Sequence, residues 1–401
     1  MELIVGIVGL LIVFIILMLL SYRFKTLSLV LITGFLLRVI AAYYHTYIHF
    51  LPDYLDPQKF ERLAWSFGEN GILEALIHFG ERGSSYTYMH TVSLIYAIIG
   101  RSVIFVQMVH VIVGIINIIL TYKLSYLIWE NDVLAKKAAW IVAIFPTLIM
   151  YSALTNREVF ISMFFLISMI YIVKWIKTKN NYFFAMGVLI FLTHYYLHGP
   201  LILGLLPLFA IFLNKNLLNG INSLKSSRLN YLFFFSFIFL IIIFITGGIL
   251  WSNVSIPYIG NLNGVNYNLI FNRVLYLNTG GAAYPQWLMP DNFLDLITLT
   301  IPRMIYLFFS PFPWDIRSAN QLLGLIDSIL YVYIFFNVIK SSKFSHKSLN
   351  LNSIFVILGF IFIVYSWGVS NYGTGLRHRA KFVPVLIAIA SANVPRIKIW
   401  G

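Results

Sequence analysis

The chain of 401 residues is 60% hydrophobic and only 10% charged, with a net charge of +14 and no cysteine. A soluble protein carries about 25% charged residues, so this composition excludes a soluble globular domain. The lack of cysteine excludes disulfides and zinc–thiolate sites. The sequence shows no RNA- or DNA-binding module, and lysine in cytoplasmic loops is the usual source of positive charge in a membrane protein, so we expect no nucleic-acid partner.

Apolar runs of about 20 residues recur along the chain, as helices that cross a bilayer require. A β-barrel would show alternating segments of about ten residues, which are absent. We therefore predict an all-α, polytopic transmembrane helical bundle of about 11–13 spans, forming one integral-membrane domain over residues 1–401. The clearest predicted spans are residues 3–20, 27–45, 103–128, 138–153, 158–175, 181–194, 199–213, 231–250, 322–340, 352–369 and 382–395.

The connecting segments divide between two faces. Six of them are basic, which predicts the cytoplasmic side: SYRFKT, ENDVLAKK, KWIKTKNN, NKNLLNGINSLKSSRLN, KSSKFSHKS and PRIKIWG. All six fall on one side only if the short apolar segments 86–99 and 293–310 do not both cross, so we interpret both as interfacial or re-entrant. The alternative is that both cross and another predicted span does not. The large outer loops are then 46–102, with interfacial helices, and 251–321.

The first span, residues 3–20, has no basic residues before it and no small-residue cleavage site. Arg23 and Lys25 follow the span rather than precede it. These features favour a retained span with its N-terminus outside over a cleaved signal peptide.

Two aspartates follow the second span in the stretch LPDYLDPQKFERLAWSF. Asp56 precedes Pro57 and a helical repeat, so one interpretation makes it the N-cap of a juxtamembrane helix. In the other, Asp56 removes a proton from an acceptor hydroxyl at the outer membrane surface. Asp53 has no comparable capping role and is the second candidate for this base.

A third candidate acid, Glu158, opens the span that begins after Thr155, Asn156 and Arg157. The spacing of Thr155 and Glu158 is that of a capping box. The alternative places Glu158 opposite the first outer loop, where it orients the catalytic base or helps to hold a metal ion.

Arginine is concentrated in the predicted outer segments, although orientation requires no positive charge there. The guanidinium group suits bidentate contact with phosphate. Within SNYGTGLRHRAKF, a glycine-containing turn that would offer backbone N–H groups to an anion precedes a run of cationic residues. We predict a phosphate or diphosphate site here, with Arg157 and the intramembrane Arg38 as further ligands. The run consists of Arg377, His378, Arg379 and Lys381.

His194 and His198 occur at i,i+4 spacing in THYYLHGP, with Tyr195 between them. Such a pair can chelate zinc, but no carboxylate is near in the sequence. We therefore expect contact with sugar or phosphate rather than metal. Ordinary packing at the membrane interface is the alternative.

The stretch LPDYLDPQKFERLAWSFGENG resembles the first outer loop of the GT-C superfamily of glycosyltransferases, which use polyprenyl-phosphate-linked sugars. The signature is an aspartate, three residues, an aromatic residue, then alanine and glycine. The segments SPFPWD and GTGLRHRAKFVP look like parts of bacterial members from exopolysaccharide or O-antigen assembly. The residues that match the signature are Asp56, Phe60, Ala64 and Gly68 or Gly71. The chain lacks a clean Asp-Glu or Asp-Asp pair, so we assign no ligands to a divalent metal (Mg or Mn).

The resemblance implies a donor sugar on undecaprenyl phosphate or diphosphate and a glycan or lipid-linked acceptor. It also implies an active site on the extracytoplasmic face of a bacterial inner membrane. The enzyme would act together with other membrane proteins of polysaccharide assembly, and its reaction could be the polymerisation of repeat units. Asp56 or Asp53 would be the base, and the arginines and His378 would stabilise the departing phosphate. A lipid-linked glycan flippase is the alternative, which predicts charges at mid-membrane and two similar halves. A non-catalytic assembly subunit is the third possibility.

Overall fold

The computed structural model describes residues 2–48, 55–79, 86–221, 281–317, 319–342 and 351–395. The described residues are about 84% helical and form no strand. Six of the described helices are long and apolar enough to cross a membrane, which supports a multi-pass membrane protein. They cover Glu2–Arg23, Lys25–Ile48, Val103–Trp129, Glu158–Thr178, Asn181–Leu213 and Gly324–Ser341.

Helix α6 (Val103–Trp129) is the central element of the N-terminal half. It packs against α1 (Glu2–Arg23), α2 (Ser28–Ile48), α7 (Asp132–Ile144) and α9 (Glu158–Thr178). The Ser102 hydroxyl accepts from the Phe105 amide and caps the start of α6, and Glu130 ends it in the left-handed region with φ 52°. A helix apolar on all sides is expected to be buried, and α6 is the most buried of the six candidate spans.

The predicted span 138–153 is interrupted. Helix α7 ends at Ile144, and Pro146 begins the short helix α8 (Pro146–Tyr151). Proline has no amide hydrogen, and its ring clashes with the preceding turn, so a continuous helix through this position is disfavoured. The segment from Ser152 to Arg157 then leads into α9. This break turns the chain where the candidate site lies.

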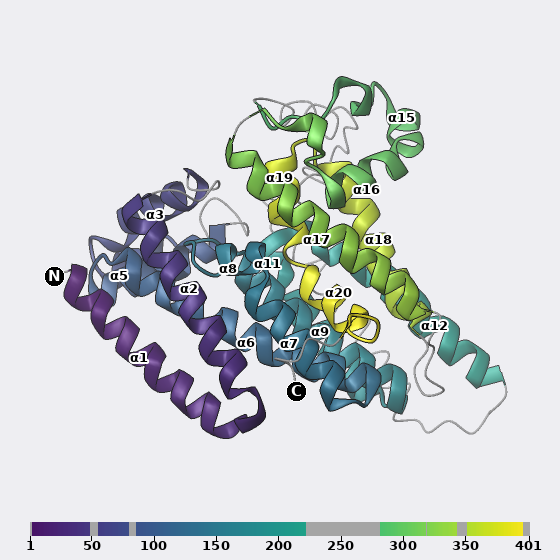
Figure 1. Ribbon diagram of the computed structural model, residues 1–401, viewed down its shortest axis with the longest axis horizontal. Helices are drawn as coiled ribbons and strands as arrows, with labels where there is room; N and C mark the ends of the chain where they lie inside the picture. The colour runs from purple at the N-terminus through teal and green to yellow at the C-terminus, as the bar shows by residue number, and fades with distance from the viewer. Residues whose placement is uncertain are drawn as a thin grey trace.

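One end of the bundle gathers segments predicted to be cytoplasmic. Lys177 forms an ion pair with Glu130 at 2.5 Å, which joins the end of α9 to the end of α6. The Trp129 indole donates to the Ala388 carbonyl of α20 (Val383–Ala390), and Lys137 donates to the Val394 carbonyl. In Figure 1 α20 lies next to α7 and α9. The grouping agrees with the predicted common side of these segments.

Three helices of the first predicted outer loop form a separate small layer. They are α3 (Leu55–Gly68), α4 (Ile72–Ile77) and α5 (Thr87–Ile99). Ala64, Tyr88, Met89, Val92 and Tyr96 supply their shared core. With 13 residues, α5 is about 20 Å long by helical rise, short of the roughly 30 Å hydrocarbon core. Figure 1 shows this layer beside α1 and α2.

The rest of the described chain, from α10 onward, combines long helices with short helical segments. Segment 293–310 consists of two short helices that meet at Leu299, and the predicted span 231–250 lies outside the described residues. In Figure 1 α17 and α18 lie on the opposite flank from α1 and α2. The elements are α10 (Asn181–Leu192), α11 (His194–His198), η3 (Gly199–Gly204), α12 (Leu205–Ile221), α15 (Phe293–Thr298), α16 (Thr300–Phe309), α17 (Ala319–Ser342), α18 (Asn352–Gly368) and α19 (Tyr372–Arg379).

Arg303 of α16 ties this half together. Its guanidinium is fully buried and donates to the carbonyl oxygens of Leu288, Ser366, Trp367 and Val369. A buried charge must be hydrogen-bonded to avoid a large desolvation cost. These bonds hold α16 against the end of α18, directly before α19 begins.

Candidate functional site: a buried carboxylate among cations

Glu158 at the start of α9 meets the last turn of α19. The Arg377 Nε donates to Glu158 Oε1 at 2.7 Å, and the Lys381 ammonium nitrogen lies 3.9 Å from the same oxygen. The side chains of Glu158, Arg377 and Lys381 are 1%, 14% and 0% exposed. Residues separated by more than 200 positions in the sequence therefore form one buried ionic cluster.

The turn before α9 brings the first outer loop to this cluster. The Thr155 hydroxyl donates to the Pro57 carbonyl of α3 at 3.3 Å. Helix α9 begins at Glu158, with Arg157 at the N-cap position and no side-chain capping bond. The predicted capping box is therefore wrong, because the Thr155 hydroxyl is turned toward α3. This contact places the start of α3 beside the start of α9.

Arg157 supplies a third cation. Its guanidinium lies 5.8 Å from the centre of the Phe60 ring of α3, and its charge acts on Glu158 together with those of Arg377 and Lys381. Among the described side chains, three cationic groups thus surround one carboxylate. Buried positive charge without a matching negative charge is costly to desolvate, and an anion would offset that cost, which is the role predicted for Arg157 and Arg377.

Only the backbone of the predicted base is placed. Asp53 lies outside the described residues. Helix α3 begins at Leu55, so Asp56 lies within its first turn rather than at the N-cap. The next residue, Pro57, accepts the bond from Thr155. The backbone at Asp56 is therefore close to the turn that leads to Glu158.

A network of rings lies beside the ionic cluster. The Lys381 Nζ is 2.8 Å from His378 Nδ1, and the Tyr365 hydroxyl is 2.8 Å from His198 Nδ1. The rings of His198 and His378 lie edge to face at 4.9 Å, and Lys381 lies 5.6 Å from the Tyr365 ring centre. His198 therefore joins the predicted phosphate site and is not part of a zinc-chelating pair with His194.

Burial controls the charge of two groups in this network. It lowers the pKa of His378 well below 6.5, and the charges of Lys381, Arg377 and Arg157 lower it further. Burial also lowers the pKa of Lys381 well below 10.5; Glu158 opposes this shift, while Arg377 and Arg157 add to it. Both groups thus favour the neutral form more than they would in water.

We expect this burial to make the protein less stable in mild acid. Unfolded His378 binds a proton as the pH falls below about 6.5, whereas folded His378 does not, so stability falls in that range by up to about 1.4 kcal/mol per pH unit. The measurement is the Tm of the purified protein between pH 7.5 and 5.0 for wild type and His378→Asn. The variant should show a shallower loss of Tm. Identical pH slopes would contradict the assignment.

The other two predicted sugar ligands, His194 and Tyr195, contact protein groups. His194 is fully buried, with Nδ1 2.8 Å from the Phe191 carbonyl oxygen and Nε2 3.3 Å from that of Ile161. Both ring nitrogens therefore contact backbone acceptors, and the packing interpretation replaces the sugar-binding one. Tyr195 is half-buried, with its ring against Tyr196.

Arg379 does not belong to the phosphate site. It is fully buried and pairs with Asp327 of α17 at 2.8 Å, and it also donates to the carbonyls of Phe308 and Ser310. Thr147 of α8 donates to the same aspartate. All of these acceptors come from the protein, so we remove Arg379 from the predicted phosphate ligands.

The predicted anion-binding turn before Arg377 is also wrong. Helix α19 begins at Tyr372, and the Asn371 side chain accepts from the amides of Gly373 and Thr374. The protein itself therefore caps the N-terminus of α19. Arg377 and His378 project from its last turn instead. The cluster consequently depends on side-chain charge and not on free backbone amides.

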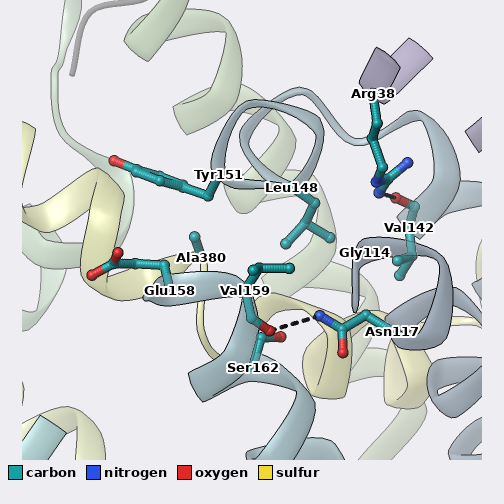
Figure 2. A pocket seen from close by; sticks show the side chains of 10 residues that line it. All are labelled: Arg38, Gly114, Asn117, Val142, Leu148, Tyr151, Glu158, Val159, Ser162 and Ala380. Carbon is teal, nitrogen blue, oxygen red and sulfur yellow. Dashed lines mark hydrogen bonds between the residues drawn. The ribbon is translucent and has the colours of Figure 1, made fainter. Parts of the chain in front are cut away.

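Arg38 lies deeper in the bundle. It donates to the carbonyls of Gly34, Ala143 and Val142, which connects α2 to the end of α7. Figure 2 shows Arg38 and Glu158 on opposite sides of a pocket that Tyr151 and Leu148 also line. The pocket volume is about 10 Å³, enough for one water molecule. Arg38 is therefore a structural connection and not a direct phosphate ligand, and this pocket cannot hold a sugar.

The cluster does not suit a divalent metal. Among the described residues, no three His, Asp or Glu side chains come together in a way that could hold a metal ion. Glu158 is surrounded by three cations, which would repel Mg²⁺ or Mn²⁺. We therefore assign no metal-binding role to Glu158.

Sequence reasoning missed Tyr365 and Asp327. Tyr365 lies within an apolar run and has no local feature that marks it. Asp327 is a single acid within a predicted span, which by itself suggests function but does not identify Arg379 as its partner. No family model matches the chain, and no curated protein matches it.

Proposed function

We propose that the protein is a membrane glycosyltransferase. It transfers a sugar or oligosaccharide from a polyprenyl phosphate or diphosphate to a glycan or lipid-linked acceptor in cell-surface polysaccharide assembly. One observation carries the proposal: in the described part of the chain, Arg157, Arg377 and Lys381 surround the buried carboxylate of Glu158. The site would lie on the extracytoplasmic side of a bacterial inner membrane.

The charge of the cluster suits the departing group of this reaction. When the bond between sugar and phosphate breaks, negative charge builds on the phosphate oxygens, and cations held in place stabilise it. Arg377 presents a planar group of donors that matches a phosphate. Glu158 accepts a hydrogen bond from the Arg377 Nε and so holds the guanidinium group in a fixed orientation within the cluster.

Asp56 is the proposed base. The acceptor oxygen attacks the anomeric carbon, its proton passes to the carboxylate, and the bond from that carbon to the phosphate oxygen breaks. Attack opposite the phosphate inverts the configuration at the anomeric carbon. The contact between Thr155 and Pro57 supports this role, because it brings the start of α3 next to Glu158.

The test uses a deletion strain complemented with Asp56→Asn protein. We expect loss of the surface glycan, since a carboxamide cannot accept the proton. Gel analysis of the glycan, at protein levels matched by immunoblot, is the measurement. Glu69→Gln is the matched control, because Glu69 is an exposed acid just beyond the other end of α3.

Normal glycan in the Asp56→Asn strain would remove Asp56 from the mechanism. Retention of single units without long chains would indicate a repeat-unit polymerase. Accumulation of lipid-linked intermediates on the cytoplasmic leaflet would indicate a flippase instead.

A further inference from the structure

Lys381 occupies an unusual position within the cluster. Its side chain is 0% exposed, and its Nζ lies 2.8 Å from the His378 ring nitrogen. Among the described side chains, Glu158 is the only carboxylate within 4 Å of that Nζ, at 3.9 Å. Arg377 already donates to that oxygen at 2.7 Å. Lys381 therefore shares the Glu158 carboxylate with Arg377, and the Arg377 guanidinium lies closer to it.

The elements around Lys381 add positive charge and ring systems. Arg377 and His378 come from α19, Arg157 and Glu158 from the start of α9, His198 from α11 and Tyr365 from α18. Arginine stays protonated in proteins, whereas lysine loses its proton when burial and like charges oppose the charged form. Of the three cations, Lys381 is therefore the one able to become neutral.

We propose that the cluster binds a phosphate-class anion together with one proton, and that Lys381 takes up this proton. The inference rests on the proposed function in so far as the anion is the phosphate of the donor. Before the anion binds, a neutral Lys381 leaves two arginines against Glu158. An anion in contact with the cluster restores the attraction that keeps Lys381 charged.

The same charge serves the transfer step. A sugar phosphodiester carries one negative charge, and the polyprenyl phosphate that departs carries up to two. The acceptor O–H bond breaks and its proton passes to the base, the new glycosidic bond forms, and the bond from the anomeric carbon to the phosphate oxygen breaks. The departing phosphate thereby gains one negative charge. Lys381, already protonated when the donor bound, stabilises that added charge.

The experiment measures sulfate binding to the full chain in nanodiscs of zwitterionic lipid. Sulfate mimics phosphate but stays a dianion near neutral pH. Any proton taken up on binding is therefore bound by the protein and not by the sulfate. Calorimetry at pH 8.0 in two buffers of different ionisation enthalpy counts the protons taken up per sulfate bound. We expect wild type to take up about one proton and its Kd to rise about tenfold per pH unit in this range.

Two variants identify the acceptor. Lys381→Met should bind sulfate through the arginines without proton uptake, and Lys381→Arg should bind it with a charge that does not change between pH 7 and 9. The Tm of each variant shows whether it is folded. Arg62→Ala, which removes an exposed arginine of α3, should behave as wild type.

The outcomes separate the two proposals. Sulfate binding without proton uptake by wild type would overturn the role of Lys381 but leave the phosphate site standing. Equal uptake in wild type and Lys381→Met would also overturn it, and loss of that uptake in His378→Asn would assign the proton to His378. Absence of sulfate binding to wild type would overturn the anion site itself, and with it the basis of the proposed function.

Discussion

Replacing Arg377 with alanine should lower the rate of sugar transfer by about 100-fold or more. The substitution removes the guanidinium closest to Glu158 and one of the three cations of the cluster. Loss of a single donor that stabilises charge in a transition state costs about 10²–10³ in rate. The measurement is surface glycan synthesis per unit of protein in the complemented deletion strain, followed by transfer from polyprenyl-linked donors in nanodiscs.

Two further variants show whether Arg377 acts on the substrate or only holds Glu158. Arg377→Lys keeps the charge but loses the planar group of donors, so we expect intermediate activity. Glu158→Gln removes the carboxylate that orients Arg377 while leaving all three cations. Arg62→Ala is the control for a general loss of positive charge, because Arg62 is exposed on α3. Activity of Arg377→Ala within a fewfold of wild type would reject the site.

Removing Asp327 should have the largest effect on stability. The variant Asp327→Ala would leave Arg379, which is 0% exposed, without its carboxylate partner. Breaking a buried ion pair by removing one partner costs about 3–5 kcal/mol. The Tm of the purified protein and its level in membranes should both fall, while Lys136→Ala at the half-exposed pair with Asp132 should cost at most about 1 kcal/mol.

A double variant separates the charge from the packing. Asp327→Leu combined with Arg379→Met replaces both charges by apolar groups, and such replacements are often neutral or stabilising. We expect it to recover most of the Tm lost in Asp327→Ala. If Asp327→Ala has a wild-type Tm, or the double variant is less stable than the single one, the pair does not hold α17 to α19.

Much of the helical framework was predictable from composition and periodicity. Long apolar runs produced the helices α1, α2, α6 and α9 because a chain in lipid must satisfy its own backbone hydrogen bonds. The break at Pro146 also follows from the missing amide hydrogen. The short helix α5 agrees with the interfacial interpretation of segment 86–99, since it is too short to cross.

The site was predictable only in part. The sequence alone singled out Glu158 and Arg377 as unusual charged residues on the predicted outer side, but it did not pair them. It assigned the same role to Arg377 and Arg379, which are two residues apart. In α19 these side chains point in different directions, so that Arg377 reaches Glu158 while Arg379 reaches Asp327.

The sequence by itself determined that this is a helical membrane protein with most of its charged residues outside the long apolar runs. Hydrophobicity and periodicity act over a few turns of helix, so local residues suffice for that conclusion. Only the tertiary structure decided which cations gather around Glu158 and which pair with another carboxylate. That outcome depends on contacts between residues far apart in the chain, such as Glu158 with Arg377 and Asp327 with Arg379.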